Sequence, residues 1–186
     1  GKDEEKLIDV DIDSTAVFLK GGCTPAVRVS CNGKRLSQGK DYTVSFKDNK
    51  AAYAVSGKNA TAVISGKGSY CGKITKSFRI KTKDLSDTTL LVNDKVYTGK
   101  AKGHVTKFTL TDTDGKAMKA GTDYEKEILY TYASPTELEN GERKSAGDMV
   151  GDTDIVPAGT TIRVTVKGKG SYENSITGEY RIIAKE

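Results

Sequence analysis

Apolar and polar residues alternate through most of the chain, which is the side-chain period of a β-strand. The alternation covers residues 8–12, 27–31 and 42–46, and it returns over 128–132 and 162–166. Such a pattern places one side of each strand on a core and the other side in water. Pairs such as Asn-Gly and Asp-Gly separate the runs and are typical of tight turns. No window sustains the 3.6-residue stripe of a helix. We therefore predict an all-β protein built from antiparallel strands, without helices.

The chain also contains a sequence repeat. Residues 62–80 (AVISGKGSYCGKITKSFRI) align without a gap with residues 164–182 (VTVKGKGSYENSITGEYRI), at a shift of 102 positions. Upstream, residues 32–42 match residues 114–124 at a shift of 82 positions. One order of motifs with one change of length indicates two copies of a domain, the second carrying about 20 extra residues. We predict domains at 1–82 and 83–186, joined end to end by a short linker that limits bending.

The extra residues of the second copy lie near 133–154. This segment is polar and almost free of large apolar side chains, so we predict a long exposed loop or a hairpin extension. It contains an acidic cluster, Asp148, Asp152 and Asp154, which is a candidate for weak calcium binding because calcium prefers carboxylate oxygens. No other metal ligand set is predicted.

Composition and charge bound the classes of partner. The chain is 35% hydrophobic and 30% charged, and no apolar run approaches the roughly 18 residues of a membrane span, so we predict no membrane insertion. The net charge of +5 is uneven: Lys and Arg outnumber Asp and Glu by 16 to 8 through Lys83, whereas the remainder has 14 against 17. The basic first copy favours anionic partners. It has no arginine cluster and no interleaved aromatic residues, so we predict solvated lysines and no nucleic-acid partner.

Cysteine and histidine give little sign of catalysis. Cys23, Cys31 and Cys71 show no C-x-x-C spacing, and the single histidine, His104, lies in the other copy among polar residues. We predict no zinc site, no Ser/His/Asp set, no cofactor and no enzymatic activity. We also predict a disulfide between Cys23 and Cys71, with Cys31 left as a buried thiol. Such a bond contributes roughly 2–4 kcal/mol in a small domain.

The repeated residues have structural roles that require no ligand. The glycines at 66 and 68, and their partners at 168 and 170, suit a bulge or a positive φ at a strand corner. The tyrosines that follow, Tyr70 and Tyr172, are expected to fill one end of the domain while the hydroxyl reaches a backbone group. Asp41 and Asp123 are expected to cap turns ahead of a strand.

The repeated motifs resemble a known family. The run Tyr97-Thr98-Gly99-Lys100-Ala101, the segment G-T-D-Y at 121–124, P-A-G-T-T-I-R-V-T-V at 157–166 and both G-K-G-S-Y motifs are similar to the immunoglobulin-like repeats of secreted surface proteins of Gram-positive, often gut-dwelling, bacteria. The resemblance covers about residues 15–183. It implies two tandem immunoglobulin-like antiparallel β-sandwich domains, secreted or associated with the cell wall. The cysteines depart from the family pattern.

Two functions follow as expectations. The first is a non-catalytic structural or interaction module, a spacer or adhesin stalk, whose partners are adjacent domains of the same polypeptide and an unknown surface molecule. The second is a carbohydrate-binding module that contacts a host or dietary glycan through exposed tyrosines, for which the candidates are Tyr130, Tyr132 and Tyr53. In both cases we expect a monomer.

Overall fold

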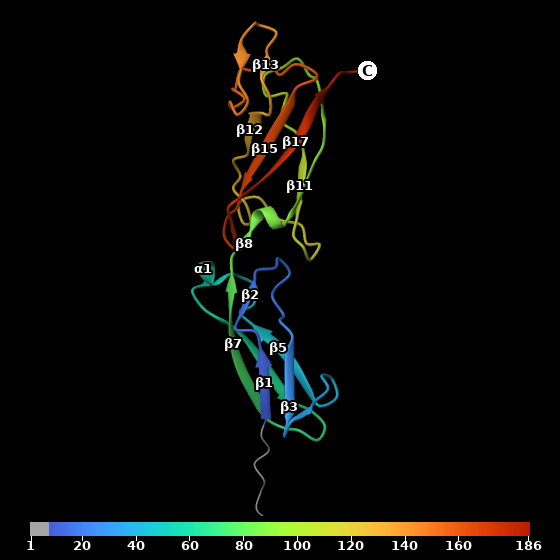
Figure 1. The fold of residues 1–186 in the computed structure, drawn as a ribbon, viewed down its shortest axis with the longest axis vertical. Coiled ribbons are helices and arrows are strands. Elements are labelled where there is room, and N and C mark those ends of the chain that lie inside the picture. Colours follow the sequence, from blue (N-terminus) through green and yellow to red (C-terminus); the bar gives the residue numbers. More distant parts are fainter. Residues whose placement is uncertain (1–7) are drawn as a thin grey trace, which may run out of the picture. The chain divides into compact units, whose positions relative to one another are not determined.

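The computed structural model describes residues 8–186, which divide into two compact units (Figure 1). The first unit ends at Lys83 and the second begins at Asp84, one residue beyond the predicted boundary. Strands dominate both units, so the prediction of an all-β protein is confirmed. No helix among the described residues is long and apolar enough to cross a bilayer.

The first unit contains two sheets. One has the strand order β1-β3-β4, and the other has the order β2-β7-β6-β5. The elements are β1 (Ile8–Ile12), β2 (Thr15–Val17), β3 (Val27–Cys31), β4 (Lys34–Arg35), β5 (Tyr42–Lys47), α1 (Tyr53–Ser56), β6 (Ala60–Gly66) and β7 (Lys73–Lys81). The pairing is antiparallel except between β2 and β7, which run parallel.

Burial alternates along these strands as the sequence pattern predicts. In β3, Val27, Val29 and Cys31 are buried while Arg28 is exposed, and in β6 the buried residues are Ala60, Ala62 and Ile64. The two sheets are also joined by a hydrogen bond, because the Tyr42 hydroxyl donates to the carbonyl of Val27 (3.3 Å). The core of the unit therefore receives side chains from strands of both sheets.

The second unit repeats this arrangement. Its larger sheet has the order β10-β17-β15-β12, with β10 and β17 parallel, which matches β2-β7-β6-β5 strand for strand. Smaller ladders join β11 to β9 and β13 to β14. The elements from the unit boundary onward are β8 (Lys83–Asp84), η1 (Leu85–Asp87), β9 (Thr89–Val92), β10 (Lys95–Val96), β11 (Phe108–Thr111), β12 (Leu129–Tyr132), β13 (Thr136–Glu137), β14 (Arg143–Lys144), β15 (Thr161–Lys167), β16 (Tyr172–Glu173) and β17 (Ser175–Ile183).

The prediction that the chain has no helix is wrong at two short elements. α1 is a single α-helical turn that ends at Gly57, whose φ of 69° is left-handed and suits glycine. The 3₁₀ turn η1 follows Asp84, whose side chain accepts from the amide of Ser86. Elements of three or four residues are too short to show a 3.6-residue stripe in the sequence.

The inserted segment of the second unit forms a hairpin and then an extended segment that lies along the edge of β12. β13 and β14 pair across a turn, and Leu138 within that turn is only 4% exposed. The chain then returns beside β12. There the amide of Gly147 donates to the carbonyl of Tyr132 (2.8 Å), and the amide of Val150 donates to the carbonyl of Tyr130 (3.0 Å). Residues 147–150 therefore cover the outer edge of β12.

Candidate functional site

The repeated G-K-G-S-Y motif builds the same corner in each unit. In the first unit the amide of Lys67 donates to the carbonyl of Asp41 (2.8 Å), and in the second the amide of Lys169 donates to the carbonyl of Asp123 (3.0 Å). The carboxylates of these aspartates accept from backbone amides four residues earlier, at Ser37 (2.8 Å) and Lys119 (2.7 Å). The prediction that Asp41 and Asp123 cap turns is confirmed.

The two glycines of each motif serve different purposes. Gly68 and Gly170 have φ of 65° and 64°, the left-handed region that favours glycine. Gly66 and Gly168 are needed for close approach instead. A Cβ at Gly66 would lie 2.7 Å from the amide nitrogen of Cys71, and one at Gly168 would lie 2.8 Å from the carbonyl oxygen of Tyr172. Both corners therefore depend on a bare backbone at the end of a strand.

In the second unit a buried tyrosine closes the corner. Tyr172 is 2% exposed, and its hydroxyl donates to Oδ2 of Asp112 (2.5 Å), which is itself buried. The predicted partner was a backbone group, so that detail is wrong: the acceptor is a side-chain carboxylate. Burial, followed by the hydrogen bond to Asp112, raises the pKa of Tyr172 well above its usual range. The tyrosine is therefore a neutral donor to a buried carboxyl group.

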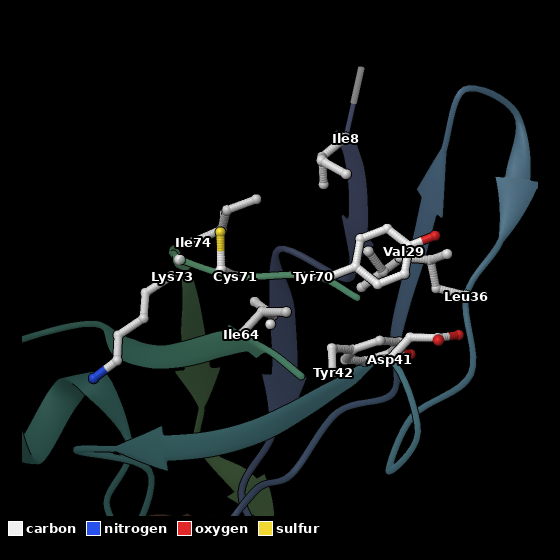
Figure 2. A pocket seen from close by; sticks show the side chains of 12 residues that line it. Ile8, Val29, Leu36, Asp41, Tyr42, Ile64, Tyr70, Cys71, Lys73 and Ile74 are labelled. Atoms are coloured by element: carbon white, nitrogen blue, oxygen red, sulfur yellow. The ribbon is translucent and has the colours of Figure 1, made fainter. Parts of the chain in front are cut away.

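In the first unit the equivalent tyrosine leaves a hollow beside it. Tyr70 is only half-buried, and it borders a pocket of about 190 Å³. Figure 2 shows its ring above Tyr42, with Val29 and Leu36 on one side and Ile64, Cys71 and Ile74 on the other. The walls are mostly apolar, and Asp41 and Lys73 add charged groups to the lining. Among the described residues, this is the hollow best suited to a small, largely apolar ligand.

The predicted disulfide is not formed. Cys23, Cys31 and Cys71 are free thiols; the first two are buried and Cys71 is exposed. The amide of Cys23 donates to the carbonyl of Asn49, which lies just beyond the end of β5 where Lys47 pairs with Thr61 of β6. Cys71 contacts Gly66, at the opposite end of β6. Strand geometry gives roughly 16 Å between Thr61 and Gly66. A disulfide requires Cα atoms within about 7 Å. The prediction for Cys31, a buried thiol, is confirmed.

The tyrosines proposed for glycan contact do not form an exposed platform. Tyr132 is fully buried, and Tyr130 is half-buried against Tyr180 and His104. Tyr53 lies in α1, and the guanidinium of Arg79 is 3.8 Å from its ring centroid. The prediction is therefore wrong for Tyr132, and one face of Tyr53 is already occupied by a cation.

The three aspartates of the inserted segment are not brought together. No group of three or more metal-ligating side chains occurs within residues 8–186. Asp148 accepts from the amide of Ser145 (2.8 Å), and Asp154 is buried in contacts of its own. Its Oδ2 accepts from the Tyr132 hydroxyl (2.9 Å) and the Gly151 amide (2.8 Å), and lies 3.4 Å from Nζ of Lys144. The calcium candidate is therefore replaced by a structural anchor for the hairpin.

Electrostatics at this anchor favour the charged pair. Burial raises the pKa of Asp154, but hydrogen bonds from Gly151 and Tyr132 and the charge of Lys144 outweigh burial and hold that pKa below its usual value. The pKa of Lys144 is raised, mainly by its contact with Glu142. Both groups are therefore ionised at neutral pH and hold the base of the inserted hairpin.

Sequence reasoning missed the environment of His104. It was expected among polar residues, but it is 6% exposed and its ring packs edge-on against Tyr130, with centroids 5.1 Å apart. Its carbonyl accepts from the Tyr180 hydroxyl, while its Nδ1 has no hydrogen-bond partner in the part of the chain described. Burial lowers the pKa of His104, and Asp154 and Asp152 oppose that shift only in part. The histidine is thus a neutral core residue.

No family model matches the chain, and no curated protein resembles it closely enough in sequence to count as a relative. The function must therefore be argued from the two corners, the hollow beside Tyr70 and the sheet edges.

Proposed function

We propose that the chain is a pair of immunoglobulin-like β-sandwich domains that acts as a non-catalytic module of a secreted or wall-associated bacterial protein. Its role is to space or present neighbouring domains of the same polypeptide, as a spacer or an adhesin stalk. The resemblance of its motifs to the repeats of Gram-positive surface proteins supports this setting.

The observation that best supports the proposal is that the repeated residues have structural roles. Asp41, Asp123 and Tyr172 hold backbone turns and buried groups of the corner, so the repeat preserves the architecture and not a set of reactive side chains. The larger sheet also has the same strand order in both units. A single residue, Thr82, separates β7 from β8, which is consistent with a short connection between domains.

Small-angle X-ray scattering tests the spacer role. A variant with four Gly-Ser residues inserted after Thr82 is the matched control, because a flexible linker broadens the distribution of end-to-end distances. For a spacer, the native chain should give a narrower distribution and a larger mean dimension than the variant. Identical broad distributions would reject this role. Protease treatment of intact cells of the source bacterium tests the surface location, since a surface domain should be cleaved while cytoplasmic proteins stay intact.

A second candidate function, glycan binding, is favoured by one observation: the half-buried ring of Tyr70 borders an open pocket lined in part by Asp41 and Lys73. An aromatic ring can cover the apolar face of a pyranose. A glycan array at low and high salt tests it, with Tyr70→Ala as the variant and Tyr97→Ala as the control in the other unit. Binding that resists salt and is lost only in Tyr70→Ala would establish this function.

A further inference from the structure

The outer edge of β5 in the first unit carries backbone groups without partners. β5 is the last strand of its sheet. The amide of Gly66 donates to the carbonyl of Gly72, so the backbone N–H of Gly66 points away from β5. Tyr42 lies opposite Gly66 in the ladder, and its backbone N–H and C=O groups therefore point away from β6. Alternate residues point the same way, so the amides and carbonyls of Val44 and Phe46 also point outward. Within residues 8–186, the outward-pointing N–H and C=O groups of these two residues have no backbone hydrogen-bond partner.

A groove runs beside these unpaired groups. Val44 and Phe46 line a hollow of about 210 Å³ together with Gln38 and the segment 24–27. Sheet edges are commonly guarded by proline, a bulge or a charged side chain within the strand, most often lysine. Residues 42–46 of β5 contain no proline and no charged residue; Lys47 follows at the end of the strand. The edge is therefore suited to pairing with an added strand.

The second unit shows what covers the corresponding edge. Phe46 lies opposite Ala62, and Tyr130 lies opposite Val164. Because Ala62 and Val164 align in the sequence repeat, Tyr130 corresponds to Phe46 by strand register. Tyr130 and Tyr132 pair with residues 147–150 of the insertion, an extended segment with the sequence GDMV. The first unit has no insertion, so its edge lacks this cover among the described residues.

Charge indicates the chemistry of the occupant. Three lysines lie at the ends of β5 or close to them: Lys47 is its last residue, and Lys40 and Lys50 lie outside it. None of them has a carboxylate partner in the part of the chain described. The nearby acids are already engaged: Asp41 caps the amide of Ser37, and Asp48 lies 3.5 Å from Nζ of Lys58. The segment that covers the edge of the second unit contains Asp148, and Asp152 follows two residues after its end.

We propose that the edge of β5 in the first unit binds an extended acidic segment of another protein as an added β-strand. The N–H and C=O groups of Val44 and Phe46 supply the ladder hydrogen bonds, and the groove receives one apolar side chain of the partner. The flanking lysines select segments with acidic residues around that apolar residue. This inference goes beyond the proposed spacer role, and it stands or falls independently of glycan binding.

Amide hydrogen exchange of the full chain tests the proposal, with the synthetic peptide SAGDMVGD as the probe. Without peptide, the amides of Val44 and Phe46 should exchange fast, whereas those of Thr43 and Ser45, which face β6, should be protected. At millimolar peptide we expect at least tenfold slower exchange at Val44 and Phe46, with little change at Tyr130 and Tyr132. Unchanged exchange at Val44 and Phe46 would overturn the proposal.

Two matched pairs of reagents sharpen the result. N-methylation of the peptide valine, whose counterpart Val150 donates to β12, should abolish protection, whereas N-methylation of the methionine should not. Lys47→Glu should weaken binding of SAGDMVGD several-fold. The same variant should improve binding of the charge-reversed peptide SAGKMVGK, in which lysine replaces both aspartates. Equal binding of both peptides to both proteins would contradict the acidic preference. Protection of Val44 and Phe46 that grows with protein concentration alone would instead identify a second copy as the occupant.

Discussion

The two corners use one backbone design but close it differently. In the second unit Tyr172 is buried and bonded to Asp112, whereas in the first unit Tyr70 is half-buried beside a pocket of about 190 Å³. By register the counterpart of Asp112 is Cys31: Val29 and Leu110 accept equivalent backbone hydrogen bonds from Leu36 and Met118, and Cys31 and Asp112 each follow two residues later and are buried. The second corner therefore has a buried carboxyl group where the first has a thiol, although the surrounding backbone hydrogen bonds are alike.

Removing each tyrosine should give the largest difference between the corners. Tyr172→Ala deletes a buried aromatic side chain and removes the hydroxyl that donates to Oδ2 of Asp112, so we expect a loss of roughly 3–5 kcal/mol in the second unit. Tyr70→Ala deletes a half-exposed ring, and its cost in the first unit should be below about half of that. Urea unfolding followed by residue-resolved NMR measures both. Equal losses would mean that the two rings contribute alike.

Removing the acceptor should have the next largest effect. Asp112→Ala leaves the Tyr172 hydroxyl and the amide of Thr113 without the carboxylate they contact, and we expect a loss of roughly 2–3 kcal/mol. Ser30→Ala, at the residue before Cys31 in the first unit, is the control and should stay within about 0.5 kcal/mol of the native chain. A loss on Ser30→Ala as large as that on Asp112→Ala would show that the open corner also depends on this position.

Lowering the pH should weaken the second unit more than the first. Because burial lowers the pKa of His104, the folded state binds fewer protons than the unfolded state, whose histidine titrates near its usual value of about 6.5. Stability is therefore fully present above pH 6.5 and falls as the pH drops through the lowered folded pKa. The urea midpoint of the second unit should be lower at pH 5.5 than at pH 7.5.

His104→Gln is the control for this pH dependence, and its urea midpoint should change little between the same two pH values. Staying above pH 5 keeps Asp154 ionised, since its folded pKa is depressed and its contribution is lost only in more acidic solution. The first unit contains no histidine within the described residues and provides an internal reference. A steeper pH dependence in the first unit would contradict the assignment to His104.

Filling the hollow should bring the first corner closer to the second. Val29→Ile adds one methylene toward the pocket, and we expect a gain of up to about 1 kcal/mol in the first unit if the added group finds free volume. The same substitution at Val164, which is fully buried, should instead destabilise the second unit through overcrowding. Thermal unfolding of both variants measures the contrast. A destabilised Val29→Ile variant would show that the pocket has no room for the methylene.

Thiol labelling is the mildest comparison, because it changes no core contact. Cys71 is exposed and should react with iodoacetamide in the native state, whereas buried Cys23 and Cys31 should react only after unfolding. Mass spectrometry of the native and denatured chain should therefore give one and three adducts. An oxidised chain with one adduct after denaturation would restore the Cys23–Cys71 disulfide.

How far the sequence could predict this structure depends on the range of the interaction involved. Alternation along residues 27–31 and 42–46 identified strands and their buried sides, because side-chain direction is a local property. The turn caps at Asp41 and Asp123 were predictable for the same reason. The pairing of Tyr172 with Asp112, 60 residues away, was not, because no local pattern identifies the acceptor.

The tyrosines and His104 show where local patterns fail. Tyr130 and Tyr132 precede the insertion, and their environment depends on residues 147–150 folding back along β12. His104 lies outside any strand, so periodicity gave no indication that it packs against Tyr130 and Tyr180. The cysteine pairing failed because positions along the chain do not show which end of a strand each residue reaches.

The hairpin β13–β14 has a consequence for protein engineering. Its base is held by the buried contacts among Asp154, Tyr132 and Lys144, while Asn140 and Gly141 at its tip are exposed. Foreign peptides inserted between Asn140 and Gly141 should therefore leave the sheets of the second unit intact, since each doubling of a flexible loop costs only about 0.6 kcal/mol. The unit would then serve as a display scaffold whose variable sequence is separated from its folding core.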